Sequence, residues 1–276
     1  MDLKGKVVVV TGASMGIGEA VAKIFAEEGA TVVLSSRDLG RLEAARSRVG
    51  HSERTLAVAC DVQNRDDIGR LARTAIDRYG RIDVWVNNAG YGLMDSVASM
   101  DMEECRLLLE TNLLGAIHGM QAALEPMKRQ HSGTVINISS IAGHIAVPYM
   151  AVYCASKHAL NAIGKAARVE LLGSGVHVMT VCPGYIDTDF AVNAVKGAER
   201  MRLRSNARRG ISAERVARAV LEGYRKRKRE VIVPWRDRLI IKLYQMFPTF
   251  VEGRMARMLR PADEVIAAAQ AARKGT

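Results

Sequence analysis

The sequence predicts an α/β protein, namely a Rossmann-type, doubly wound parallel β-sheet in three α/β/α layers, folded as a single domain. Three observations predict this fold. Short apolar runs alternate with helical patterns, glycine or polar clusters follow most of these runs, and hydrophobic residues make up 49% of the 276-residue chain, which suffices for one large core. Because ligands bind at the carboxyl ends of parallel strands, the clusters are expected to share one functional edge.

The first unit combines a β-branched run, Lys6–Val10, with a glycine-rich segment, Thr11–Gly18, and a helical pattern. A buried strand that leads through a glycine turn into a helix places backbone N–H groups around a pyrophosphate. Gly12, Gly16 and Gly18 would give the backbone access and let the helix pack closely. Their spacing differs from the usual dinucleotide fingerprint, and glycine-rich loops also form plain turns.

The second predicted strand, Thr31–Leu34, runs into Ser36 and Arg37. At this place in a βαβ unit an acidic residue selects the free 2′-hydroxyl of NAD, and an arginine accommodates the 2′-phosphate of NADP. Ser36 and Arg37 therefore predict a preference for NADP(H), with NAD(H) also allowed. In the alternative interpretation, Arg37 only begins a surface loop before the charged helix at residues 38–48.

The alternation continues to residue 233 without a repeat, low-complexity tract or linker. We expect strands at Thr55–Ala59, Val84–Val86, Thr134–Ile138, Val176–Val181 and Glu230–Val233, and helices at Arg65–Tyr79, Met102–Arg129, Val152–Leu172 and Ser212–Tyr224. Polar or glycine groups follow several of these strands, at Asp61-Val62, Asn87–Gly90 and Pro183-Gly184.

Three polar residues that follow the predicted strand Thr134–Ile138 have the spacing of an active site. Ser140 follows the strand, and Tyr153 and Lys157 share one face of the next helix because they lie four residues apart. A phenol with a reference pKa of ~10 is a poor base, and a nearby ammonium favours the phenolate. Lys157 is therefore expected to lower the pKa of Tyr153, which would exchange a proton with an oxygen held by Ser140. Alone, a Tyr-x-x-x-Lys pair is also common as a solvated pair on helices.

The ordered motifs in residues 5–190 resemble those of the short-chain dehydrogenase/reductase family. They are Thr11-Gly12-x-x-x-Gly16-x-Gly18, Asp61-Val62, Asn87-Asn88-Ala89-Gly90, Asn112, Ser140, Tyr153-x-x-x-Lys157 and Pro183-Gly184-x-Ile186-x-Thr188. The resemblance implies an NADP(H)-dependent oxidoreductase with Tyr153 as general acid/base and Ser140 as polariser of the substrate oxygen. It also implies that Lys157 holds the nicotinamide ribose and that Asn112 anchors a water-linked proton relay. Asn112 could instead cap a helix kink.

The same resemblance implies a set of cofactor contacts. They are Gly12, Ser14, Met15, Gly16, Ile17, Gly18, Ser36, Arg37, Asp61, Val62, Asn88, Ala89, Gly90, Tyr153, Lys157, Pro183, Gly184, Ile186 and Thr188. Asp61-Val62 would contact adenine, unless Asp61 only forms a turn, and Ile186 with Thr188 would hold the nicotinamide amide. NADP-selective members often carry a basic residue where this chain has Met15, so Arg37 would be the main phosphate anchor.

Substrate specificity is expected from residues 92–95, 143–150 and 185–209, of which 188–210 would form a lid. The expected substrate contacts are Ser140, His144, Val147, Met150, Tyr185 and Phe190. This mostly apolar set favours a hydrophobic ketone or secondary alcohol, such as a steroid, lipid or aromatic carbonyl compound. Core packing is the alternative role for these residues.

The carboxyl end departs from the minimal family pattern. Residues 1–234 are expected to form the catalytic domain, and residues 235–276 a basic, amphipathic extension that Pro248 breaks in two. The extension could make a subunit contact, cover the substrate pocket or lie on a membrane surface. The basic run at residues 225–229 lacks neighbouring stacking aromatics, so no nucleic acid partner is expected. The family resemblance implies a homodimer or homotetramer.

Composition limits the other functional classes. The net charge is +11, and the four cysteines, Cys60, Cys105, Cys154 and Cys182, have no metal-ligand spacing, so we expect reduced packing residues and no metal site. The first apolar run is too short for a signal peptide or a membrane span, which predicts a cytoplasmic protein with peripheral membrane contact as a further option. Two functional alternatives remain, a catalytically idle NADP(H)-binding sensor and a membrane-associated scaffold that uses the basic tail.

Overall fold

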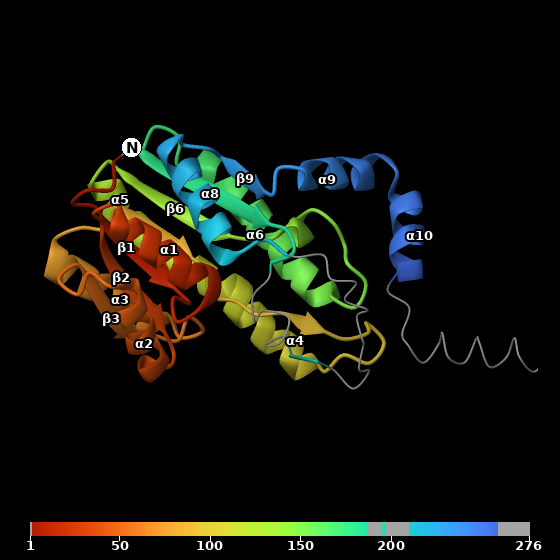
Figure 1. Cartoon of the computed structure of the whole chain (residues 1–276), viewed down its shortest axis with the longest axis horizontal. Coiled ribbons are helices and arrows are strands. Elements are labelled where there is room, and N and C mark those ends of the chain that lie inside the picture. Colours follow the sequence, from red (N-terminus) through yellow and green to blue (C-terminus); the bar gives the residue numbers. More distant parts are fainter. Residues whose placement is uncertain (1, 187–194, 197–209, 259–276) are drawn as a thin grey trace, which may run out of the picture.

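The computed structural model describes residues 2–186, 195–196 and 210–258 (Figure 1). Seven parallel strands form one sheet in the order β3-β2-β1-β4-β6-β7-β9. Their bounds are β1 Val7–Thr11, β2 Thr31–Ser36, β3 Thr55–Ala59, β4 Val84–Asn87, β6 Gly133–Ile138, β7 Val176–Pro183 and β9 Glu230–Val233. The predicted Rossmann-type parallel sheet is therefore confirmed. Thr188 and Phe190 lie outside the described residues, which include only 195–196 and 210 of the expected lid, 188–210.

Helices cover both faces of the sheet. Their bounds are α1 Gly16–Glu27, α2 Leu39–Val49, α3 Arg65–Tyr79, α4 Met102–Leu109, α5 Gly115–Arg129, α6 Ala151–Glu170, α8 Ala213–Arg225, α9 Asp237–Met246 and α10 Pro248–Met258. Four of them begin at a side chain that accepts a hydrogen bond from the first helical turn, as helix N-caps commonly do. These N-caps are Asp38, Asn64, Asp101 and Ser212.

Alternate residues of each strand supply two cores. On one face, Val8 and Val10 pack with α1, α2 and α8, and Figure 1 shows α1 beside α8. On the other face, Val9 and Trp85 pack with α3, α5 and α6. Because successive side chains of a strand point to opposite faces, the unbroken apolar runs of the sequence become strands that are buried on both sides.

The sheet reverses its winding between β1 and β4. These two strands are neighbours, with Val8 opposite Val84, although β2 and β3 separate them in the sequence. The helix that follows β1 therefore lies on one face, and the helix that precedes β4 lies on the other. This reversal opens the carboxyl ends of β1 and β4 to a ligand.

The predicted helix over residues 102–129 is interrupted. Between α4 and α5, residues Glu110–Leu114 form a π-helical turn that contains Asn112. Directly after it, Gly115 packs against Val62, where an added Cβ would come within 2.8 Å of Val62 Cγ2. Single π turns inside helices often occur at functional sites. The sequence also did not predict the two-residue strands β5 (Leu93–Met94) and β8 (Val195–Lys196), which pair in parallel and are too short to show a periodic pattern.

Beyond β9 the chain continues into α9 and α10, which project from the sheet (Figure 1). Pro248 is the first residue of α10, so the predicted break at this proline is confirmed. Within the described residues, no helix combines the length and apolarity needed to cross a membrane.

Candidate active site

The glycine turn after β1 has a shape that side chains would prevent. Gly12 and Gly16 have φ angles of +64° and +59°, in the left-handed region that favours glycine. A Cβ on Gly18 would lie 2.3 Å from the carbonyl oxygen of Gly12 and 2.4 Å from Asn88 Nδ2. The start of α1 is therefore in direct contact with the turn, and its amino-terminal N–H groups lie beside the sheet edge, where they could bind a phosphate.

Asn88, at the end of β4, fastens this turn in place. Its Nδ2 donates hydrogen bonds to the carbonyl oxygens of Thr11 (3.0 Å) and Gly12 (2.9 Å). Thr11 Oγ1 accepts from the backbone N–H groups of Asn88 and Ala89 and donates to Val86 O. This role of Thr11 was not predicted, although a polar residue at the end of a buried strand, next to a glycine turn, could have indicated it.

A cavity lies beside the glycine turn, between α1 and α2. It has a volume of about 590 Å³ and is lined by Ser14, Met15, Gly16, Glu19, Arg41, Ala44 and Arg48. Arg37 is exposed and forms no ion pair within the described residues. The neighbouring Asp38 is occupied, because its carboxylate accepts a hydrogen bond from Arg41 N (3.0 Å) and lies 3.5 Å from the Arg41 side chain. At this strand end, then, an arginine is free to bind an anion and the acid is engaged in capping.

At the end of β3, the structure places Asp61 in a turn. Its Oδ1 accepts a hydrogen bond from Gln63 N (3.0 Å), and its own N–H donates to Asp67 Oδ2 (3.0 Å). Val62 is buried beneath the π turn against Gly115. The turn-forming alternative for Asp61 thus describes its contacts, while an adenine contact stays a prediction.

Ser140, Tyr153 and Lys157 meet between β6 and α6. Ser140 caps a single 3₁₀ turn, Ile141–Gly143, where its Oγ accepts from Ala142 N (3.1 Å) and donates to Pro183 O (3.4 Å). Tyr153 is buried on α6, and burial raises the pKa of its phenol to about 12, while a hydrogen bond with Ser140 opposes this rise. The phenol is therefore protonated at neutral pH and hydrogen-bonded to the serine.

Lys157 is buried one helical turn beyond the tyrosine. Its Nζ donates to Ile138 O (3.0 Å) and lies 5.7 Å from the centre of the Tyr153 ring. Burial also lowers the pKa of the ammonium to about 8. The expectation that Lys157 lowers the pKa of Tyr153 does not hold for this geometry. The ammonium lies over the ring and donates to a backbone carbonyl, and burial is the largest influence on the pKa of the phenol.

Asn112 holds the loop that follows β4. Its Oδ1 accepts from Tyr91 N (2.9 Å), and its Nδ2 donates to Tyr91 O (2.8 Å). A Cβ on Gly90 would lie 2.9 Å from Asn112 Oδ1 and 3.7 Å from Lys157 Nζ. Asn112 and Lys157 thus approach Gly90 from two helices, and the proton-relay role of Asn112 stays a prediction. The Tyr91 contact could not be predicted from the sequence, because the two residues lie 21 positions apart.

The residues expected to contact the substrate or the nicotinamide lie in different surroundings. Val147 and Met150 pack against the small cluster around Tyr153 and Leu93, next to the catalytic candidates. Tyr185 is exposed, whereas Ile186, an expected cofactor contact, packs against the core on the α1 and α8 face.

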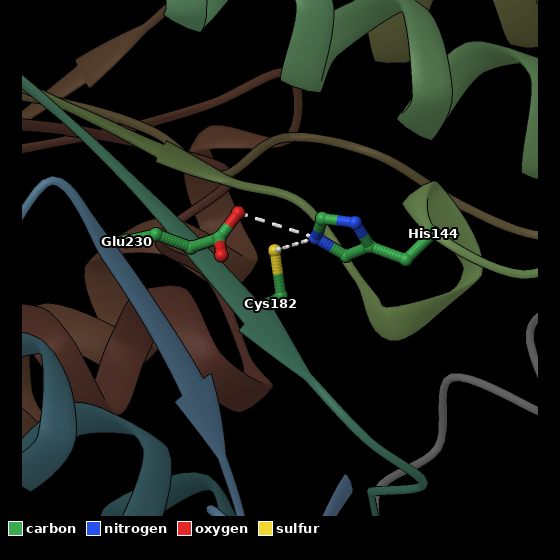
Figure 2. A group of neighbouring side chains, drawn as sticks. All are labelled: His144, Cys182 and Glu230. Atoms are coloured by element: carbon green, nitrogen blue, oxygen red, sulfur yellow. Dashed lines mark hydrogen bonds and ion pairs between the residues drawn. The ribbon is translucent and has the colours of Figure 1, made fainter. Parts of the chain in front are cut away.

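His144 contacts side chains of two strands at the edge of the sheet. Figure 2 shows the imidazole approaching β7 and β9, with its Nε2 3.2 Å from Glu230 Oε1 and 3.6 Å from Cys182 Sγ. The amide of Asn161 lies 3.4 Å from the same nitrogen. The predicted substrate contact is replaced by a contact that ties the segment after Ser140 to the edge of the sheet.

His144, Cys182 and Glu230 offer the ligand types that zinc prefers, with their ligand atoms within 4.8 Å of one another. Burial raises the pKa of the Cys182 thiol to about 12, and the positive charge of Lys165 acts on both Cys182 and Glu230. With the Asn161 amide 3.4 Å from the imidazole, we interpret the group as a hydrogen-bonded cluster of side chains. This cluster was not predicted, because its three residues come from three distant segments of the chain.

Replacing Glu230 with glutamine should remove an acid-sensitive contribution to stability. The hydrogen bond with His144 holds the pKa of Glu230 below its ordinary value of 4.5, so the stabilisation is present above that pH and is lost as the pH falls through the folded-state pKa. Thermal unfolding between about pH 6 and pH 3 should show wild type losing its advantage over Glu230→Gln. Glu222→Gln is the control, since its ion pairs with Lys226 and Lys228 are exposed. A constant difference between wild type and Glu230→Gln across this range would contradict the assignment.

Comparisons with known proteins agree with this arrangement. A family model described as short chain dehydrogenase matches residues 6–199. The chain is 35% identical over 259 residues to the ketoacyl reductase HetN of Nostoc sp., which covers 91% of this chain and 88% of that relative.

Solved structures show the same fold. A metagenomic short-chain oxidoreductase in complex with NADP is 32% identical, with a TM-score of 0.71, over 84% of this chain and 98% of that one. A short-chain dehydrogenase/reductase from Burkholderia phymatum in complex with NAD has a TM-score of 0.84 over 91% of this chain and 96% of that one, at 24% identity, and so shows the fold alone. The two complexes carry different nicotinamide cofactors.

Proposed function

The chain belongs to the short-chain dehydrogenase family of oxidoreductases, and we propose that it is an NADP(H)-dependent member that acts on a hydrophobic ketone or secondary alcohol. One observation carries the proposal, namely the buried phenol of Tyr153, hydrogen-bonded to Ser140 with Lys157 one helical turn away. A protonated phenol of this kind can give its proton to a carbonyl oxygen.

The sheet edge fits a dinucleotide. The absent side chains of Gly12 and Gly18 leave the backbone of the turn bare, and a Cβ at either position would collide with neighbouring backbone atoms. The amino terminus of α1 would hold the pyrophosphate, Arg37 the 2′-phosphate, and Lys157 the nicotinamide ribose. When bound, the nicotinamide supplies or accepts the hydride.

The residues of the chain would handle the oxygen and its proton. Ser140 would bind the substrate oxygen, and Tyr153 would donate its proton to that oxygen in reduction or accept one in oxidation. Apolar side chains next to the phenol, among them Val147, Met150 and Leu93, support a hydrophobic substrate, because they exclude water from its surroundings.

Arg37 provides the test of the cofactor preference. Arg37→Ala should raise the dissociation constant of NADPH by about tenfold or more, which corresponds to the loss of a hydrogen bond between charged groups, and should change that of NADH little. Titration of both cofactors measures this. Arg129→Ala, at the carboxyl end of α5, is the control, because among the described residues Arg129 forms an ion pair only with Glu125 of the same helix. Equal losses for the two cofactors, or a wild-type preference for NADH, would overturn the assignment.

We also propose a homodimer or homotetramer. Exposed apolar side chains on the long helices support it, namely Met102 on α4, Leu114 in the π turn and Val169 on α6. A subunit contact would remove these side chains from water. If the protein binds cofactor without turning over any ketone or alcohol, the idle-sensor alternative takes the place of the enzyme.

A further inference from the structure

Helix α9 carries an apolar stripe that faces away from the rest of the fold. Fifteen large hydrophobic side chains are exposed in the described part of the chain, and seven of them fall within residues 235–250, so the exposure is concentrated there. We call these seven the α9 face: Trp235, Leu239, Ile240, Leu243, Met246, Phe247 and Phe250. The four members that lie within α9, Leu239, Ile240, Leu243 and Met246, recur three or four residues apart, so they share one side of the helix. Trp235 precedes the helix, and Phe247 and Phe250 follow it. An apolar area of this kind marks an interaction surface.

The opposite side of α9 is attached to the body of the protein. Ile241 is only 6% exposed, and Asp237 packs against Gly184, where an added Cβ would lie 2.0 Å from Asp237 Oδ2. Rotation of α9 to bury its apolar stripe would break both contacts. The outward direction of the α9 face is therefore fixed by the fold.

Positive charges accompany the α9 face. Residues 235–258 contain five basic and two acidic side chains, so this segment has an excess of positive charge. The basic ones form no ion pair within the described residues, and they are Arg236, Arg238, Lys242, Arg254 and Arg257. A partner for this surface needs an apolar layer next to negative charge.

We propose that the α9 face docks on an anionic lipid membrane. Its apolar side chains would enter the boundary between headgroups and acyl chains, and Arg238 and Lys242 would meet lipid phosphates. Trp235 suits the same boundary, since its ring is apolar and its N–H is polar. With ten residues, α9 is too short to span a bilayer and would lie in its plane. A second copy of the chain fits less well, because a two-fold contact would bring the same uncompensated cations together.

The docking surface begins next to the candidate active site. Ser140 Oγ donates to Pro183 O (3.4 Å), Gly184 follows, and Gly184 contacts Asp237, the first residue of α9. Docking would thus hold the membrane near the edge of the sheet where the substrate oxygen binds. This step rests on the proposed function, and it assigns the substrate as a ketone or secondary alcohol with a long apolar chain that is dissolved in the bilayer.

Flotation of the full-length protein with lipid vesicles tests the docking. Wild type should float with vesicles of phosphatidylcholine and phosphatidylglycerol, and much less with phosphatidylcholine alone or at raised salt concentration. Leu243→Glu should lower the partition coefficient at least about tenfold, and Lys242→Gln about fivefold. Val97→Glu, at an exposed apolar residue outside α9, is the control and should float as wild type does.

The outcomes separate docking from catalysis. Leu243→Glu should keep full activity on a short, water-soluble ketone and lose activity on a long-chain ketone embedded in anionic vesicles. If wild type fails to float with anionic vesicles, or Leu243→Glu only dissociates an oligomer, the docking proposal is overturned. If both proteins reduce the embedded ketone equally, the assignment of the substrate is overturned. Flotation without turnover of any ketone would leave docking in place and reject the proposed function.

Discussion

Tyr153→Phe should lower ketone reduction by about 10²-fold or more, within the usual contribution of a general acid. The buried phenol is the proposed proton donor, and burial keeps it protonated at neutral pH by raising its pKa to about 12. Phenylalanine retains the ring that packs with Leu93 and Leu108, so the fold should persist. NADPH oxidation in the presence of a panel of hydrophobic ketones, together with NADPH titration, measures the effect.

Tyr224→Phe is the matched control for this experiment. Tyr224 is also buried, and burial also raises its pKa, but it packs against Phe25 on the opposite face of the sheet. Turnover by this variant should stay within about twofold of wild type. Tyr153→Phe should also bind NADPH nearly as wild type does, because the proposed role of the Tyr153 hydroxyl is at the substrate oxygen. Residual turnover of Tyr153→Phe close to that of wild type would reject the catalytic assignment.

Gly18→Ala should abolish tight cofactor binding, with a rise in the NADPH dissociation constant of at least about tenfold. The added methyl group would lie 2.3 Å from Gly12 O and 2.4 Å from Asn88 Nδ2. Because the first of these is a backbone atom, the turn or α1 would have to move away from the phosphate position. Fluorescence titration with NADPH measures the binding, and circular dichroism checks that the variant is folded.

Two further variants keep this prediction decisive. Gly69→Ala, in α3, places its methyl group 3.3 Å from the flexible end of Arg73, so it should bind NADPH normally. Asn88→Ala removes the two hydrogen bonds to Thr11 and Gly12 without adding bulk and should weaken binding by about fivefold or more. Normal cofactor affinity in both Gly18→Ala and Asn88→Ala would show that the glycine turn does not hold the cofactor.

A single sequence was enough to predict the seven strands of the main sheet, the glycine turn and the order of the sheet-edge motifs. Runs such as Val7–Val10 can only be buried in the centre of a sheet, and the positive φ angles of Gly12 and Gly16 depend on their own residue type. The four-residue interval between Tyr153 and Lys157 likewise places them on one face of any helix. These features depend on near neighbours in the chain, so a single sequence shows them.

Which partners the side chains meet depends on how distant segments come together in the fold. His144 turns from the expected substrate site to Glu230, a partner 86 positions away, and Asn112 binds the backbone of Tyr91 from a π turn that has no sequence pattern. Burial by several segments raises the pKa of Tyr153, whereas Lys157 had been expected to lower it. The sequence showed that the segment of α9 is amphipathic, but only its attachment through Ile241 showed which side faces outward. Burial and side-chain direction depend on residues that are distant in sequence, and folding brings those together.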